Sequence, residues 1–233
     1  MGKNLTIVGF DADDTLWHNE RFYQLTQERF TELLADHAEP EHLAERLLEA
    51  EKRNLGHYGY GIKGFVLSMI ETAVEVTEGR VPGHVIAELM EAGRDMLAHP
   101  VELLPHAREA VERVADTHRV LLITKGDLLH QERKLAASGL GDLFDGVEIV
   151  SEKTTEVYAR IFADHGDGAE RAMMVGNSMR SDVVPAVEAG GWGVFVPHGI
   201  EWEIEKADPP KEAPRFRELN DLAGLPDLVR DLD

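Results

Sequence analysis

Cysteine, basic charge and long apolar runs are all scarce in this chain of 233 residues. It has no cysteine, which excludes disulfides, thiolate catalysis and zinc sites built on thiolates. Its 24 basic residues face 44 acidic ones, and the formal net charge of -20 disfavours nonspecific binding to nucleic acid or to an anionic membrane. No stretch approaches the roughly 20 apolar residues that span a bilayer, and no basic stretch followed by an apolar run opens the chain. We therefore expect a cytoplasmic protein with no nucleic-acid or membrane partner.

The hydrophobic content, by contrast, is ample. At 43% it can supply a substantial core for one large domain or for a domain that carries an insertion. The acidic excess also bears on function, since an anionic substrate would need a local cation to offset it. A bound metal ion or a few well-placed lysines therefore become part of any hypothesis that involves a phosphate.

Five short runs of aliphatic and β-branched residues predict buried strands. They are residues 5–10, 119–123, 146–150, 172–175 and 193–196. Their near-continuous hydrophobicity suits strands that are covered on both faces. Stretches with helical spacing alternate with the later runs, as at residues 107–114 and 183–189. This alternation predicts an α/β fold, a doubly wound parallel sheet with helices on both sides.

The segment between the first and second runs is far longer than one crossover helix requires. Apolar residues recur in it at helical spacing from Phe22 to Leu97. We predict an all-helical cap of residues 18–98, inserted in a catalytic core of residues 1–17 and 99–233. The alternative is that these helices enlarge the core of a single domain. Near the C-terminus we expect a surface loop at 207–214 and an amphipathic helix around 219–232.

Polar side chains follow four of the five predicted strands. The segments are Asp11-Ala12-Asp13-Asp14-Thr15, Thr124-Lys125-Gly126-Asp127, Ser151-Glu152-Lys153, and Gly176-Asn177 continuing to Asp182. In open α/β sheets the ligand site lies beyond the carboxyl ends of the strands, so these groups should meet at one edge. A polar loop after any single strand would be unremarkable, but four together predict a functional site.

Phosphoryl transfer requires residues of these types. One carboxylate can attack phosphorus, and a second, two residues on, can protonate the leaving oxygen and later activate water. A metal ion must lie between these anions and the incoming phosphate, and hard oxygen ligands favour Mg²⁺. A hydroxyl and a lysine can bind the oxygens of the transferred group.

The order of these motifs resembles the haloacid dehalogenase (HAD) superfamily: Asp-x-Asp-x-Thr, then Thr, then Lys, then Gly-Asn-x-x-x-x-Asp. The resemblance covers nearly the whole chain, including a helical cap after the first motif. It implies that Asp11 is the nucleophile and a metal ligand, and that Asp13 is the general acid/base and ligates metal through its carbonyl. It implies further that Thr124 binds phosphate and that Lys153 stabilises the charges. Asn177 and Asp182 would complete the Mg²⁺ site, directly or through water.

Two neighbours of Thr124 are further candidates for substrate binding. Lys125 either contacts the substrate or is solvated, and Gly126 belongs to the same predicted loop. We expect Asp14 to be a capping residue or a supporting group without a catalytic role. Trp17 and His18 either line the entrance to the site or pack at its edge. The other histidines, His198 among them, are scattered without metal-ligand spacing and are expected at the surface.

Asp13 distinguishes two activities within the resemblance. Haloacid dehalogenases proper attack carbon, need no metal and lack an aspartate at this position, whereas phosphatases and phosphomutases have it. The sequence therefore favours a phosphatase acting on a small phosphorylated metabolite, as a monomer or homodimer. The alternatives are a phosphomutase and a noncatalytic binding protein on the same scaffold. Asn177 stands where phosphatases of this family usually have an aspartate, which predicts either a weaker metal site or a larger share of metal binding by Asp182.

Overall fold

The computed structural model describes residues 5–200 and 202–233. These residues fall into two compact units. One unit comprises residues 5–20, 101–125 and, apart from residue 201, 131–233; the other comprises residues 21–100 and 126–130. The assignment of these units as catalytic core and cap, with boundaries at 17/18 and 98/99, stays a prediction.

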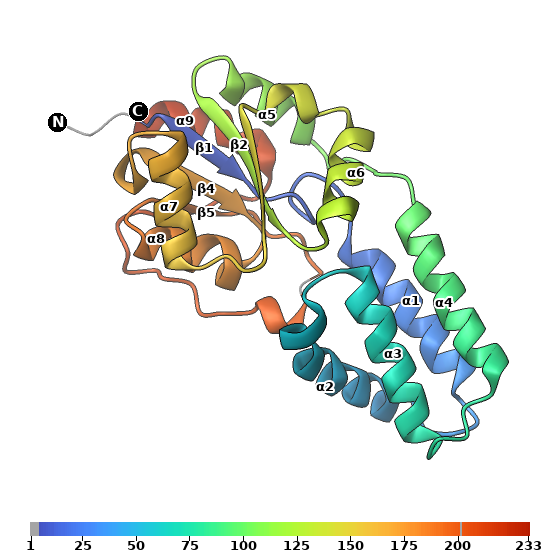
Figure 1. The fold of residues 1–233 in the computed structure, drawn as a ribbon. Helices are drawn as coiled ribbons and strands as arrows, with labels where there is room; N and C mark the ends of the chain where they lie inside the picture. Colours follow the sequence, from blue (N-terminus) through green and yellow to red (C-terminus); the bar gives the residue numbers. More distant parts are fainter. Residues whose placement is uncertain (1–4, 201) are drawn as a thin grey trace. The chain divides into compact units, whose positions relative to one another are not determined.

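The first unit is built on a six-stranded, wholly parallel sheet in the order β3-β2-β1-β4-β5-β6 (Figure 1). The strands are β1 (Ile7–Phe10), β2 (Arg119–Lys125), β3 (Gly146–Val150), β4 (Ala172–Gly176), β5 (Trp192–Phe195) and β6 (Phe216–Glu218). The order reverses direction at β1, since the chain first adds β2 and β3 on one side and then β4 to β6 on the other. The carboxyl end of β1 therefore lies at the switch point where ligands bind in such sheets.

Helices cover both faces of the sheet, and the alternation of side chains along β1 shows why. Val8 and Phe10 point into one hydrophobic cluster, which includes side chains of α5 (Ala107–Ala115) and α9 (Leu225–Leu232). Ile7 points to the opposite cluster. That cluster contains side chains of α7 (Thr155–His165) and α8 (Val184–Glu188). The predicted doubly wound α/β fold is confirmed.

The C-terminal region differs from the prediction in two places. β6 was not predicted, because it is only three residues long and pairs on one side only, with β5. The last helix is shorter than the predicted 219–232 and occupies Leu225–Leu232. A short 3₁₀ turn at Leu222–Gly224 precedes it, and the Asp221 side chain caps this turn by accepting from the Ala223 amide (2.9 Å).

The second unit contains four helices, α1 (Glu20–Leu33), α2 (Pro40–Tyr58), α3 (Ile62–Val76) and α4 (Gly83–Ala98). Their apolar faces form one core around residues such as Phe30, Leu47 and Met69. Residues 126–130, where α6 (Leu128–Ser138) begins, also group with this unit, and Asp127 pairs with Lys63 of α3 (2.7 Å). None of the described helices has the length and apolar character needed to cross a membrane.

Candidate active site

The loop after β1 holds Asp11 at the carboxyl end of the sheet. The Asp11 amide donates to the Val175 carbonyl of β4 (2.9 Å), which extends the pairing of β1 with β4 by one residue. The Ala12 carbonyl then accepts from the amides of Thr15 (3.3 Å) and Leu16 (2.8 Å) and turns the chain back. The backbone of Asp11 is therefore fixed by the central strands, which suits a group that must be positioned for attack.

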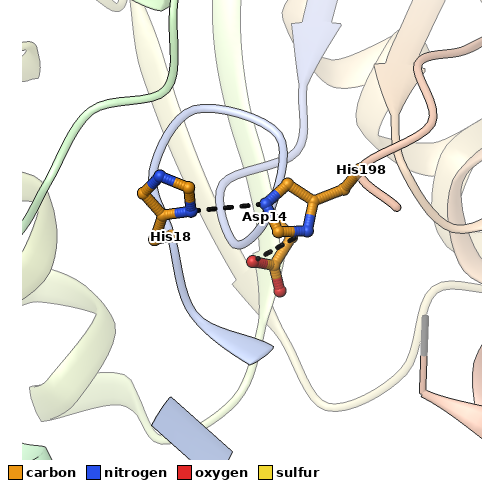
Figure 2. Close-up of side chains that lie close together, drawn as sticks. All are labelled: Asp14, His18 and His198. Atoms are coloured by element: carbon orange, nitrogen blue, oxygen red, sulfur yellow. Dashed lines mark hydrogen bonds and ion pairs between the residues drawn. The ribbon is translucent and has the colours of Figure 1, made fainter. Parts of the chain in front are cut away.

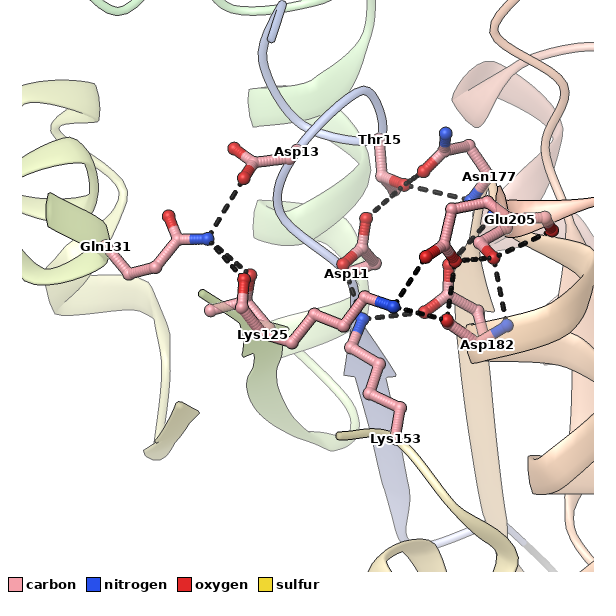
Figure 3. Close-up of polar contacts among 12 residues, drawn as sticks. Asp11, Asp13, Thr15, Lys125, Gln131, Lys153, Asn177, Asp182 and Glu205 are labelled. Atoms are coloured by element: carbon pink, nitrogen blue, oxygen red, sulfur yellow. Dashed lines mark hydrogen bonds and ion pairs between the residues drawn. The ribbon is translucent and has the colours of Figure 1, made fainter. Parts of the chain in front are cut away.

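The carboxylate of Asp11 is bound at both of its oxygens (Figure 3). Lys153 Nζ donates to Oδ1 (2.5 Å), and the Thr15 hydroxyl donates to Oδ2 (3.0 Å). The same ammonium donates to Asp182 Oδ1 (2.7 Å), so Lys153 joins the ends of β1 and β4. The Lys153 side chain is only 2% exposed. Lys153 therefore lies beside Asp11, and Asp182, which the sequence assigned to the metal site, binds the same ammonium.

The ion triad of Asp11, Lys153 and Asp182 carries two carboxylates and a single ammonium in a buried place. Burial and the nearby Asp182 raise the pKa of Asp11, Lys153 opposes both, and the net result is a pKa of about 7. For Lys153, burial acts to lower the pKa, but Asp11 and Asp182 outweigh burial and hold it well above its usual range. Lys153 is therefore charged at neutral pH. One negative charge remains without a cation when both carboxylates are ionised.

Figure 3 shows Asp13 pointing away from this triad, toward Gln131. Three side chains donate to its carboxylate. They are Lys134 Nζ (2.5 and 2.7 Å to the two oxygens), Gln131 Nε2 (3.0 Å) and the indole of Trp17 (2.7 Å). Burial acts to raise the pKa of Asp13, but the charge of Lys134 and the three hydrogen bonds together outweigh burial and hold this pKa below its ordinary value. Gln131 also donates to the buried hydroxyl of Thr124 (3.0 Å), so one amide links the two predicted residues.

Asn177 lies at the point where oxygen atoms of the β1 loop converge. With its amide nitrogen turned toward them, Asn177 donates to the Asp13 carbonyl (3.0 Å), Thr15 Oγ1 (3.1 Å) and Asp11 Oδ2 (3.2 Å). Rotation of the amide by half a turn would offer its own oxygen to the same place. The resulting set of a carboxylate, a main-chain carbonyl and an amide oxygen is made of hard oxygen ligands and fits Mg²⁺. Both oxygens of Asp182 already accept hydrogen bonds, from Lys153 and from the Ser178 amide (2.9 Å).

Lys125 is held beside the triad rather than solvated. Its ammonium contacts Glu205 Oε1 (2.6 Å) and donates to the Ser181 hydroxyl (2.8 Å). Glu205 also accepts from the hydroxyls of Ser178 and Ser181, each at 2.5 Å. Burial acts to raise the pKa of Glu205, but Lys125 and the two hydroxyls lower it below its ordinary value. The carboxylate thus anchors Lys125 next to Asp182.

The structure brings together all the predicted site residues except one. Gly126, whose φ of 138° favours glycine, groups with the helical unit and not with the residues around Asp11. Three residues of the site were missed. Lys134 and Gln131 lie three positions apart on α6, directly after the Thr124 loop, and this helical spacing could have identified them. Glu205 ends a short 3₁₀ turn (Glu203–Glu205) in the long connection after β5 and has no recognisable spacing signal.

Gly176 leaves no room for a side chain at the end of β4. A methyl group there would lie 2.2 Å from Asp182 Oδ2 and 2.4 Å from its Cγ. We expect Gly176→Ala to destabilise the protein by about 2–4 kcal/mol, because Asp182 must move and lose its contacts with Lys153. Thermal unfolding measures this loss of stability. The control is Gly83→Ala, because a methyl group added at Gly83 meets nothing within 4 Å. Equal Tm values for the two variants would contradict it.

A doubly wound parallel sheet with a buried carboxylate and lysine at its switch point defines this chain as an α/β protein with a candidate active site. The chain belongs to the haloacid dehalogenase-like hydrolase family, whose sequence pattern matches residues 5–190. A haloacid dehalogenase-like family hydrolase from Xanthomonas campestris is 45% identical, with a TM-score of 0.89 over 100% of this chain and 93% of that one.

Two more distant structures share the fold. A protein described as a predicted phosphoglycolate phosphatase from Haemophilus somnus 129PT is 17% identical, with a TM-score of 0.65 over 97% of this chain and 98% of that one. A 2-haloacid dehalogenase from Pseudomonas syringae pv. Tomato DC3000 is 20% identical, with a TM-score of 0.61 over 98% and 100% of the two chains. Similarity to both indicates the architecture and does not distinguish the two chemistries.

Proposed function

We propose that this protein is a Mg²⁺-dependent phosphatase that hydrolyses a small phosphorylated metabolite through an aspartyl-phosphate. The observation that carries the proposal is that two carboxylates, two residues apart in the sequence, lie in different environments. Asp11 lies in the buried triad with Lys153 and next to the converging oxygens, whereas Asp13 lies on the other side of the loop among donors of α6. Two carboxylates with distinct surroundings suit a nucleophile and a separate acid/base.

In the first step Asp11 attacks phosphorus, a bond forms between its oxygen and phosphorus, and the bond from phosphorus to the leaving oxygen breaks. Asp13 gives a proton to the leaving oxygen. In the second step Asp13 takes a proton from water, which attacks phosphorus and releases inorganic phosphate and free Asp11. When bound, Mg²⁺ supplies charge neutralisation for the phosphate. Lys153 balances the charge of Asp11, and Thr124 donates its hydroxyl to the transferred group.

Asp13 must gain a proton before it can act as the acid, although Lys134 favours its ionised form in the absence of substrate. A phosphate dianion bound between Asp11 and Asp13 adds negative charge beside Asp13. Such a charge favours the protonated carboxyl. The proposal therefore requires that substrate binding, and not the free protein, prepares Asp13 for proton donation.

The test is release of inorganic phosphate from p-nitrophenyl phosphate and from a panel of phosphorylated metabolites, with Mg²⁺ or with EDTA. We expect release that requires the metal ion. Halide release from 2-haloacids without metal, in place of phosphate release, would instead identify a dehalogenase. Isomer interconversion that exceeds phosphate release would identify a phosphomutase, and inactivity toward the whole panel would support a binding protein.

A further inference from the structure

A second group of potential metal ligands lies beside the catalytic loop, apart from the oxygen atoms around Asn177. It consists of Asp14, His18 and His198 (Figure 2). One ligand atom from each residue lies within 4.8 Å of one from each of the others. His198 Nε2 is 3.4 Å from His18 Nδ1, and His198 Nδ1 is 3.4 Å from Asp14 Oδ1. The expectation that His198 is a surface residue is wrong, since its side chain is only 9% exposed.

Asp14 is held in an unusual backbone conformation that favours glycine. Its φ is 60°, a left-handed value at which asparagine and aspartate are tolerated better than other side chains. The carboxylate is buried and accepts from the amides of Asn19 and Glu20, each at 2.8 Å. It therefore caps the start of α1, as one of the two sequence hypotheses proposed. Two amides leave lone pairs on both carboxylate oxygens for another partner.

His198 supplies the independent observation that a ligand is missing. Its Nδ1 is buried and makes no hydrogen bond of ordinary distance and angle among the described residues, although Asp14 Oδ1 lies 3.4 Å away and the backbone of Ile200 also acts on the ring. A buried ring nitrogen without a partner is costly and needs an explanation. The rings of His18 and His198 meet edge to face with centroids 5.5 Å apart, so their nitrogens approach without stacking.

We propose that Asp14, His18 and His198 form a second metal site, for Zn²⁺ or a similar divalent transition-metal ion. Two imidazoles and one carboxylate are ligands that such ions prefer, in contrast to the oxygen set that fits Mg²⁺. A nitrogen and an oxygen bound tetrahedrally to Zn²⁺ lie about 3.4 Å apart, the spacing that His198 Nδ1 and Asp14 Oδ1 already have. No two of the three ligand atoms lie more than 4.8 Å apart, so each separation must shorten by at most roughly 1.4 Å to reach this spacing. The metal would join residues 14–18 to the segment after β5.

Co²⁺ is the probe, because its visible absorption reports nitrogen ligation directly. Untagged protein is titrated with Co²⁺ in a large excess of Mg²⁺, which occupies the oxygen site. We expect one equivalent to bind with bands of a four- or five-coordinate ion. His18→Gln and His198→Gln should each weaken binding at least about 10-fold, because loss of a ligand costs no less than loss of an outer partner. His37→Gln, at an exposed histidine of the helical unit, is the matched control and should bind as the wild type does.

Zn²⁺ is the second probe, and thermal unfolding in excess Mg²⁺ is the readout. An ion that binds only the folded state raises Tm, and the rise should occur in the wild type and in His37→Gln but not in His18→Gln. The proposal is overturned if the wild type takes up no Co²⁺ under these conditions. It is equally overturned if both histidine variants retain wild-type affinity. Neither readout uses catalysis, so failure of this proposal is independent of the phosphatase proposal.

Discussion

Replacing Asp11 by Asn is expected to lower kcat for phosphate release by roughly 10⁴-fold or more, the scale seen when a member of a nucleophilic machinery is lost. The amide has nearly the same shape, but its oxygen is a poor nucleophile and its nitrogen cannot accept from Lys153. No aspartyl-phosphate can form, so the variant should also show no burst of leaving group in the first turnover. Stopped-flow measurement with p-nitrophenyl phosphate tests both statements.

The matched control is Asp142→Asn, which makes the same chemical change at an exposed position. It should keep wild-type kcat and KM. Retention of activity within about 10-fold by Asp11→Asn would contradict the assignment of the nucleophile. Loss of activity together with a loss of folded structure would be uninformative, and far-UV circular dichroism of both variants separates that case. Removal of a charge from the buried triad leaves Lys153 paired with Asp182, so we expect the Asp11 variant to remain folded.

The sheet was predictable because its central strands are buried on both faces. Such strands appear as continuous apolar runs, and all five predicted runs correspond to strands β1 to β5. β6 was not predicted, because the hydrophobic pattern of a three-residue edge strand is too short to distinguish it from a loop. Leu25 fits the helical spacing of apolar residues in α1, yet it is 58% exposed. Spacing predicts which residues share a face of a helix, but it does not predict whether another element packs on that face.

The site was predictable wherever its residues lie at the carboxyl end of a strand or shortly after it. The switch point of a parallel sheet collects such residues whatever the intervening sequence, so Asp11, Thr124, Lys153 and Asp182 could be grouped in advance. Glu205 could not, because an irregular segment carries it back to Lys125. The cluster of Asp14, His18 and His198 joins positions 180 residues apart and depends on the same segment after β5. Only the tertiary fold brings residues so far apart in the sequence into contact, so the sequence pattern could not predict this cluster.

Lys153→Met should have the largest effect on stability of any single change at this site. The methionine replaces the apolar stem of the lysine but lacks the terminal ammonium, so Asp11 and Asp182 remain buried without a cation. Removal of one partner from a buried ion pair typically costs ~3–5 kcal/mol. In a chain of this size each kcal/mol lowers Tm by roughly 2–4 °C. We expect this loss at pH 8 in EDTA, measured by urea or thermal unfolding. Lys211→Met, at an exposed lysine, should stay within about 0.5 kcal/mol of wild type.

The loss should also depend on pH in a defined direction. The folded pKa of Asp11 is raised to about 7 from 3.8, so its contribution to stability is full below pH 3.8 and declines as pH rises through about 7. Below pH 7 the folded wild type keeps a proton on Asp11, and Lys153 then has one carboxylate less to neutralise. Above pH 7 the wild type gains the attraction between the ionised Asp11 and Lys153, which the variant lacks.

The difference in unfolding free energy between wild type and Lys153→Met should therefore grow from pH 6 to pH 8.5. The charge of Lys153 does not change in this range, because its pKa lies well above its usual range. Mg²⁺ should restore part of the stability of the variant at the higher pH, since the ion binds the same oxygens and supplies the missing positive charge. A difference that shrinks as pH rises would show that Asp11 is not the group that Lys153 neutralises.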